Sequence, residues 1–318
     1  MKISLLEPIG LTFDEIEELA KEIRSLGAEF TYYDTKTTDP AELIRRSEGQ
    51  DAVMIANNPY PDEVVRALPD LKMIAVAFTG IDHVGLEACR EKGIMVLNCA
   101  GYSTVSVAEE VIGLTLAVYR KLLEGDSAVR GGKTSAGLTG LEIAGKTVGI
   151  LGCGTIGIQT GKLFKAFGAE VLAYARHERP EWKEEGFIPA SVEEILEKCD
   201  IISINMPNNA STKGFFGREQ INAMKPGSIL INCARGPIVD NEALAEALNA
   251  GRIAGAGIDV FDMEPPIPAD YPLVSAKNTV LMPHVGFLTK EAMVRRGIIE
   301  FSNVASWIKG SPENVCSF

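Results

Sequence analysis

The chain has 318 residues, 46% of them hydrophobic and 23% charged, which predicts a soluble globular protein long enough for two domains. Its net charge of -12 at pH 7 predicts repulsion from phosphate backbones and argues against a nucleic-acid partner. The six cysteines have no C-x-x-C spacing, which indicates reduced thiols in a cytoplasmic protein and no metal site. The apolar N-terminus is interrupted by Glu7, and no long apolar run is free of charge, so neither a signal peptide nor a membrane span is predicted.

Residues 1–98 alternate short apolar runs with amphipathic segments, as in a doubly wound parallel sheet. Thr12 and Glu15 have capping-box spacing at the start of one helix, and Asp39-Pro40 opens another. Strands are expected near 3–6, 29–33, 52–56, 72–77 and 94–97. With a C-terminal helix over 289–318, this region is predicted to form a flavodoxin-like domain.

A long helix over 104–123 and an irregular loop over 125–140 are predicted to lead into a second doubly wound domain, which spans 99–288. Its strands are expected near 147–151, 171–175, 201–204, 228–231, 253–258 and 279–281. The C-terminal helix can return to the first domain, so a cleft between the two domains is expected.

Three glycines follow the strand at 147–151. Gly152, Gly154 and Gly157 have G-x-G-x-x-G spacing, and an amphipathic helix comes directly after them. In this context the first glycine permits a tight turn, the second lets a pyrophosphate approach the backbone, and the third lets helix and strand pack closely. The second domain is therefore predicted to be a Rossmann dinucleotide-binding domain.

Several segments in the second half of the chain resemble the D-isomer-specific 2-hydroxyacid dehydrogenases. The C-terminal signatures of that family are similar to I-L-I-N-C-A-R-G-P-I-V-D, G-I-D-V-F-D-M-E-P-P and M-P-H-V-G-F-L-T. The resemblance covers nearly the whole chain and includes A-F-T-G-I-D-H-V and S-T-V-S-V-A-E-E. One departure is Gly85, which stands where the family commonly has aspartate.

The resemblance implies three catalytic residues. Arg235 would bind the substrate carboxylate, His284 would transfer a proton to or from the substrate oxygen, and Glu264 would hold the histidine. The residue types suit these tasks, because a guanidinium pairs bidentately with a carboxylate and histidine is the usual proton donor near neutral pH. The alternative roles are a surface ion pair for Arg235, a core histidine for His284 and a solvated loop charge for Glu264.

The resemblance also assigns binding residues. The backbone N–H groups of Thr79 and Gly80 would receive the substrate carboxylate, which makes the first domain the substrate-binding domain. Asp259 would hold the nicotinamide carboxamide, with a strand-end turn as its alternative role. Further cofactor contacts are assigned to Thr155, Ile156, Pro207, Thr212 and Cys233.

The end of the strand at 171–175 bears on the choice between NAD and NADP. A dinucleotide fold that prefers NAD carries an acidic residue there, but this chain has Ala175. Arg176, His177 and Arg179 follow, a cationic group suited to the 2′-phosphate of NADP. NADP is therefore the predicted cofactor and NAD the alternative, in which these basic residues are merely solvated.

The R-x-x-R-P pattern over 176–180 resembles the NADPH-preferring glyoxylate/hydroxypyruvate reductases of the family. The predicted activity is therefore hydride transfer between NADP(H) and a small D-2-hydroxy acid/2-oxo acid pair, with glyoxylate or hydroxypyruvate as the favoured 2-oxo acid. Two alternatives remain, a 3-phosphoglycerate dehydrogenase and a nucleotide-sensing, corepressor-like binding protein. The resemblance further implies a homodimer formed through the cofactor domain, with the helix over 104–123 and its following loop at the interface.

Overall fold

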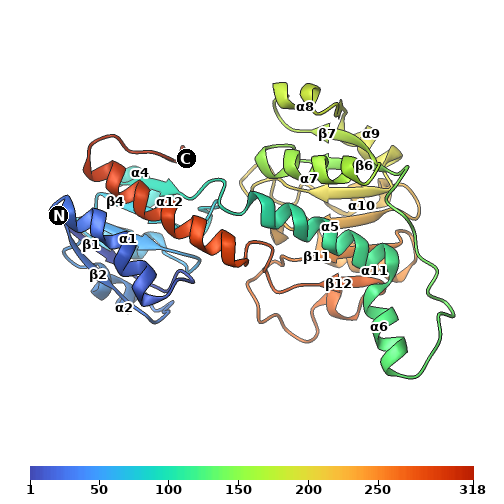
Figure 1. Cartoon of the computed structure of the whole chain (residues 1–318), viewed down its shortest axis with the longest axis horizontal. Coiled ribbons are helices and arrows are strands. Elements are labelled where there is room, and N and C mark those ends of the chain that lie inside the picture. Colours follow the sequence, from blue (N-terminus) through green and yellow to red (C-terminus); the bar gives the residue numbers. More distant parts are fainter. The chain divides into compact units, whose positions relative to one another are not determined.

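The computed structural model describes residues 1–318. The chain forms two compact units, one made of Met1–Ser103 with Leu288–Phe318 and the other of Thr104–Phe287. Both units are α/β with an entirely parallel main sheet, which confirms the predicted fold class (Figure 1).

The first unit is built on a five-stranded sheet with strand order β2-β1-β3-β4-β5. This is the flavodoxin-like order, in which the chain reverses direction across the sheet after β2. The strands are β1 (Lys2–Leu5), β2 (Glu29–Tyr32), β3 (Ala52–Ile55), β4 (Met73–Val76) and β5 (Met95–Asn98). The residues of β3 and β4 are all buried, as expected for central strands covered on both faces.

The helices of the first unit begin where the sequence predicts. Thr12 and Glu15 form the predicted capping box, and Asp39 caps the helix that Pro40 opens. Helix α1 packs against α12. The helices are α1 (Phe13–Ser25), α2 (Pro40–Ser47), α3 (Asp62–Ala67), α4 (Leu86–Lys92) and α12 (Lys290–Ile308).

The structure gives a reason for the glycine at position 85. Gly85 precedes α4, and a Cβ atom there would clash with the backbone of Asp62. The Asp62 carboxylate accepts a hydrogen bond from the Ala88 N–H at 2.9 Å. Asp62 therefore does from a neighbouring segment what a capping aspartate at position 85 would do locally.

The C-terminal helix is shorter than predicted. It ends at Ile308, and the residues beyond it turn back to the edge of the first sheet. There Val315 pairs antiparallel with Leu97, and the Cys316 N–H donates to the Val96 carbonyl at 2.9 Å.

The second unit contains a seven-stranded sheet with strand order β12-β11-β10-β9-β6-β7-β8, the order of a Rossmann fold. The two-residue strand β8 was not predicted. The strands are β6 (Thr147–Leu151), β7 (Glu170–Tyr174), β8 (Ile188–Pro189), β9 (Ile201–Ile204), β10 (Ile229–Asn232), β11 (Gly255–Ile258) and β12 (Thr279–Leu281).

One predicted helix of the second unit is in fact two. Lys121 adopts the left-handed conformation with φ 50° and separates α5 from α6, so α6 occupies part of the predicted loop over 125–140. Two short 3-10 helices, η1 (Gly236–Ile238) and η2 (Pro272–Ser275), also occur. The α-helices are α5 (Thr104–Arg120), α6 (Leu122–Arg130), α7 (Thr155–Ala166), α8 (Pro180–Glu184), α9 (Val192–Lys198), α10 (Arg218–Ala223) and α11 (Asn241–Asn249).

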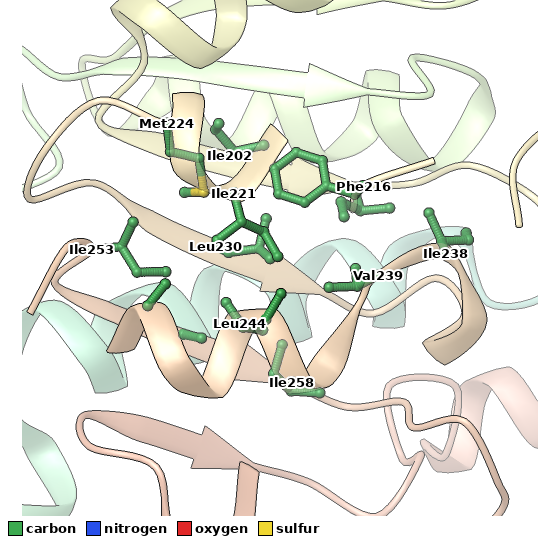
Figure 2. Close-up of a cluster of buried hydrophobic side chains, with 14 of the residues drawn as sticks. Ile202, Phe216, Ile221, Met224, Leu230, Ile238, Val239, Leu244, Ile253 and Ile258 are labelled. Carbon is green, nitrogen blue, oxygen red and sulfur yellow. The ribbon is translucent and has the colours of Figure 1, made fainter. Parts of the chain in front are cut away.

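Successive residues of the central strands enter opposite faces of this sheet, as strand geometry requires. Ile202 and Leu230 pack with residues of α10 and α11, in the cluster drawn in Figure 2. Ile201 and Ile229 belong instead to the cluster beneath α5 and α7. Both faces of this sheet are thus covered, as is usual for an all-parallel sheet.

The predicted catalytic and cofactor segments of this unit share one edge of the sheet. The glycine turn follows β6, Arg235 follows β10, Asp259 follows β11 and His284 follows β12. Because all seven strands are parallel, these segments leave the same carboxyl edge, where doubly wound folds bind ligands. None of the helices is long and apolar enough to cross a membrane.

Candidate active site

The glycine turn has the geometry that a dinucleotide requires. Gly152 has φ 89°, and a Cβ atom there would lie 2.6 Å from the Met206 nitrogen. A Cβ atom at Gly157 would lie 2.6 Å from the Gly152 carbonyl oxygen, so this residue allows α7 to approach β6. The first and third glycines are therefore required by the backbone itself.

The second glycine is different because it faces open space. Gly154 is the N-cap of α7, and within 4 Å of a Cβ atom built there lies only Nη2 of Arg179, at 3.8 Å. Thr155 and Ile156 form the first turn of the helix, whose N–H groups have no intrahelical partners. This arrangement fits a pyrophosphate, which would accept hydrogen bonds from these N–H groups.

The segment after β7 carries two arginines, of which Arg179 lies close to this turn. Arg176 donates from Nη2 to the Ser211 hydroxyl at 2.8 Å, while Arg179 reaches toward Gly154 from the N-cap of α8. His177 lies between them and is exposed.

The loop after β9 contains two of the predicted cofactor contacts. The Thr212 hydroxyl donates to the Pro207 carbonyl at 2.5 Å, and accepts from the Asn209 N–H at 2.9 Å. Cys233, another predicted contact, directly follows β10. The structure therefore places these residues on loops at the same sheet edge as the glycine turn.

His284 and Glu264 are in direct contact. Nδ1 of His284 lies 3.0 Å from Oε1 and 2.9 Å from Oε2 of Glu264. The Phe287 ring packs edge-on against the imidazole, with 5.4 Å between ring centroids. The carboxylate fixes the ring so that Nδ1–H is the donor to Glu264, and the opposite nitrogen, Nε2, points away from that carboxylate.

The backbone of His284 has an uncommon conformation. Its φ is 57°, in the left-handed region that non-glycine residues rarely adopt. Asp259 supports it, because its main-chain oxygen accepts from the His284 N–H at 2.8 Å. The two carboxylate oxygens of Asp259 accept from the N–H groups of Val285 and Gly286, each at 2.8 Å.

Asp259 is almost completely buried, and burial raises the pKa of its carboxyl group, although the N–H groups of Val285 and Gly286 oppose that shift. Glu110 on α5 is a second carboxyl group near Asp259. The pKa of Glu110 is raised, first by burial and then by the negative charge of Asp259. A carboxylate oxygen has two acceptor positions, so these contacts leave the predicted bond to a nicotinamide carboxamide open.

The loop carrying Glu264 is tied to the body of the unit through Asp262. Oδ1 of Asp262 accepts from the Asn241 side-chain amide at 3.0 Å, and Oδ2 accepts from the Tyr271 hydroxyl at 2.7 Å. These bonds hold the segment just before Glu264, and so restrict the carboxylate that contacts His284.

Arg235 lies on a loop that packs onto the same region. A Cβ atom at Gly236 would clash with the backbone of Phe261, so only glycine allows this approach. Asn232, buried at the end of β10, donates from its amide to the Arg235 carbonyl at 3.1 Å and accepts from the Ala234 N–H at 3.0 Å. The loops that carry Arg235 and Glu264 are therefore packed together through their main chains.

The predicted substrate loop belongs to the first unit. Thr79 and Gly80 follow β4, and the Thr79 carbonyl accepts from the Asn98 side chain at 2.7 Å. The Phe78 carbonyl accepts from the Cys99 N–H at 2.9 Å. The loop is thus fastened to the residues that follow β5, at the carboxyl edge of the first sheet.

Comparison with known proteins decides the family. Residues 112–286 match the D-isomer specific 2-hydroxyacid dehydrogenase, NAD binding domain. The hydroxypyruvate reductase of Blautia hydrogenotrophica is 34% identical over 99% of this chain and 99% of its own. The chain belongs to the D-isomer-specific 2-hydroxyacid dehydrogenases.

Several other relatives and one solved structure match most of this chain. The glyoxylate reductase of Thermofilum pendens is 38% identical over 85% of this chain and 81% of its own. The structure of an acyclic imino acid reductase in complex with NADPH and D-Arg has a TM-score of 0.90 and 28% identity, and covers 100% of both chains. Relatives named D-3-phosphoglycerate dehydrogenase also match.

This 2-hydroxyacid dehydrogenase is therefore an oxidoreductase whose glycine turn and α7 fit a nicotinamide dinucleotide. Several residues that shape its site were not predicted from the sequence. Asn232, Asp262 and Asn241 fix loops without carrying the expected chemistry. The position of Asn232 directly before C-A-R-G is a signal that could have found it, because a buried polar residue at a strand end commonly bonds the following turn.

Proposed function

We propose that this dehydrogenase reduces a small 2-oxo acid, glyoxylate or hydroxypyruvate, to the D-2-hydroxy acid with NADPH as the reductant. The contact between His284 Nδ1 and Glu264 carries the proposal, since it fixes the tautomer and orientation of a proton donor. Glyoxylate reductase and hydroxypyruvate reductase are the names of two similar relatives.

In this mechanism Arg235 pairs its guanidinium with the substrate carboxylate and polarises the adjacent carbonyl. The family resemblance assigns the N–H groups of Thr79 and Gly80 to substrate binding as well. When bound, the nicotinamide supplies a hydride to the carbonyl carbon. His284 donates the Nε2 proton to the carbonyl oxygen, and Glu264 stabilises the imidazolium before that transfer.

The first test is a panel of 2-oxo acids assayed by NADPH oxidation, with glyoxylate, hydroxypyruvate and 3-phosphohydroxypyruvate included. In His284→Gln, kcat should fall by about 100- to 10,000-fold, because the general acid is removed. The dissociation constant of NADPH should stay within about twofold of the unmutated value, because His284 does not form the glycine turn.

Each alternative function gives a different result in this panel. A clear preference for 3-phosphohydroxypyruvate would assign the chain to the 3-phosphoglycerate dehydrogenases. Binding of NADPH without turnover of any acid would indicate the corepressor-like binding protein. An activity that His284→Gln leaves unchanged would contradict the proposed proton donor.

The preference for NADPH is proposed from the segment after β7. Ala175 stands where an acidic residue would bind the ribose of NAD, Arg176 donates to Ser211, and Arg179 lies near the glycine turn. We expect NADPH to give the higher kcat/KM, by about 10- to 100-fold, and Arg176→Ala to remove the difference. Equal kcat/KM values for NADPH and NADH in the unmutated enzyme would contradict this preference.

A homodimer through the second unit is also proposed. Helix α6 has no buried residue, and Leu122, Leu123 and Val129 are 53%, 57% and 77% exposed. With the loop that follows, α6 extends away from the remainder of the second unit (Figure 1). A second copy of the chain would cover these side chains. Sedimentation should show a dimer, which Leu123→Glu weakens; a monomeric unmutated protein would refute the proposal.

The six cysteines suit a cytoplasmic location, which completes the proposal. All six are free thiols, and four of them are buried. Unpaired cysteines in such numbers are typical of proteins kept in a reducing compartment.

A further inference from the structure

Trp182 has contacts that link the segment after β7 to the glycine turn. Its side chain lies in α8 and is only 2% exposed. The indole Nε1–H donates to the Cys153 carbonyl at 2.9 Å, and Cys153 stands between Gly152 and Gly154. The one polar side-chain atom of this buried tryptophan therefore hydrogen-bonds the loop that is predicted to bind the pyrophosphate.

The neighbours of Trp182 hold α8 in place. The Trp182 carbonyl accepts from the Phe187 N–H at 2.8 Å. Phe187 packs on α7 at Gly161, where a Cβ atom would lie 2.5 Å from the ring. Helix α8 is therefore attached both to the glycine turn and to the helix that follows the turn.

Arg179 is positioned through this attachment. It is the N-cap of α8, and its carbonyl accepts from the Trp182 N–H at 3.1 Å. Its Nη2 atom lies 3.8 Å from the Cβ position of Gly154, at the start of α7. The N-terminal end of a helix carries partial positive charge, so a guanidinium held there is repelled unless an anion is present.

Arg176 is fixed separately, at the other end of the segment. Its Nη2 donates to Ser211 Oγ at 2.8 Å, and the Ser211 hydroxyl donates to Asn209 Oδ1 at 2.7 Å. Arg176 is thus anchored through its guanidinium at Ser211, and Arg179 through its main chain at Trp182. Each anchor reduces the conformational entropy that is lost when the two residues bind a phosphate.

We propose that Trp182 is a positioning residue for cofactor preference: through its bond to Cys153 it holds Arg179 where the guanidinium meets the 2′-phosphate of NADPH. The inference rests on the NADPH preference proposed above. Trp182 touches neither cofactor nor substrate in this proposal, and acts only through Arg179 and the glycine turn.

The test is Trp182→Phe, which keeps an aromatic ring and removes the N–H donor. Dissociation constants for NADPH and NADH would be measured from the fluorescence of the reduced nicotinamide itself. We expect the NADPH constant to rise about fivefold to tenfold and the NADH constant to change by less than about twofold. Trp307→Phe is the matched control, because Trp307 lies in α12 of the first unit, and it should alter neither constant.

Arg179→Ala separates failure of this inference from failure of the cofactor preference. It should bring the two dissociation constants together, and Trp182→Phe added to it should not change their ratio further. If Arg179→Ala lowers the preference while Trp182→Phe weakens both cofactors equally, Trp182 is only structural and the inference is wrong. If the unmutated enzyme binds NADPH and NADH equally, the cofactor preference is wrong. If it prefers NADPH but Arg179→Ala leaves the ratio unchanged, Arg179 does not meet the 2′-phosphate and the inference is wrong.

A measurement with Trp182 intact covers the case in which Trp182→Phe does not fold. In Trp307→Phe, Trp182 is the sole tryptophan, since the chain has two. Binding of 2′,5′-ADP should shift its emission more than binding of 5′-AMP, which lacks the 2′-phosphate. Equal shifts at saturation would overturn the proposed role.

Discussion

The two units share a parallel-sheet architecture but differ in how they bury charge. The first unit buries Glu7, Arg46, Arg296 and Glu300, each at most 7% exposed, whereas Asp259 is the one charged residue buried in the second. Buried charge costs free energy unless it is paired or hydrogen-bonded. In the second unit this cost is confined to Asp259, which bonds the segment that carries His284, and in the first it is spread over Glu7, α2 and α12.

Three of these carboxyl groups also differ in how their oxygens are satisfied. Asp259 uses both carboxylate oxygens to accept backbone N–H groups. Glu7 uses one oxygen for two N–H groups, and Glu300 has no hydrogen-bond partner on either oxygen. The same chemical change, carboxyl to amide, should therefore have three different consequences.

The largest effect is expected for Asp259→Asn. An asparagine amide must turn its NH₂ group toward either the Val285 or the Gly286 N–H, which leaves a buried donor without an acceptor. The second unit should lose about 2–3 kcal/mol of its free energy of unfolding. Urea denaturation followed by Trp182 emission in a Trp307→Phe background measures this unit.

Asp259→Asn should also lower kcat, because the left-handed backbone of His284 loses part of its support. The paired control is Asp200→Asn, which changes a carboxylate of the same unit that bonds the Thr147 N–H and Lys225 and does not contact the His284 segment. Unchanged stability and kcat in Asp259→Asn would show that the carboxylate is not what supports His284.

At pH values close to 4.5, Glu300→Gln should have a smaller effect, which grows as pH rises. Burial raises the pKa of Glu300 well above its usual value of 4.5. A carboxyl group with a raised pKa makes its full contribution to the stability of the folded unit below pH 4.5, its pKa in the unfolded chain. That contribution is lost as pH rises through the pKa of the folded state. Across that window the unmutated first unit should lose up to about 1.4 kcal/mol per pH unit more than Glu300→Gln, in which Glu7 still has a pKa raised by burial.

The measurement for Glu300→Gln is urea denaturation at several pH values, followed by Trp307 emission in a Trp182→Phe background. The difference in free energy of unfolding should increase with pH in favour of the variant. Parallel pH profiles would mean that Glu300 does not titrate within the folded unit.

The smallest effect is expected for Glu7→Gln. The amide oxygen can keep both bonds that Glu7 Oε1 now accepts, from Ala56 at 2.8 Å and Asn58 at 3.1 Å. The free energy of unfolding should change by less than about 1 kcal/mol, whereas Glu7→Ala should cost about 2–3 kcal/mol. The same Trp307 assay compares the two variants, and an equal loss in both would show that the acceptor bonds contribute little.

The sequence predicted the features that depend on local chemistry. Apolar runs bounded by turn residues placed most strands within a residue or two, and Gly152 and Gly157 have the backbone roles expected from their spacing. Thr12 and Glu15 form the expected cap, because all of its partners lie within one turn.

Features set by distant partners were not predictable in the same way. Lys121 ends α5 in a left-handed conformation, although that conformation is usually adopted by glycine or asparagine. Trp182 resembles any core aromatic in the sequence, because its bond to Cys153 joins residues on separate elements. Likewise, the contact of His284 with Glu264 was expected from the family resemblance and not from spacing alone.

The segment after α12 has a consequence for how the first unit behaves among its neighbours. An outermost strand exposes a row of unused N–H and C=O groups, which is a template for fibre-like stacking between molecules. Val315 occupies that template on β5 by pairing with Leu97, and the Asn98 N–H donates to the Asn314 carbonyl at 3.1 Å. This short stretch therefore protects the sheet from aggregation, and its removal would leave β5 as an exposed edge that can pair with another molecule.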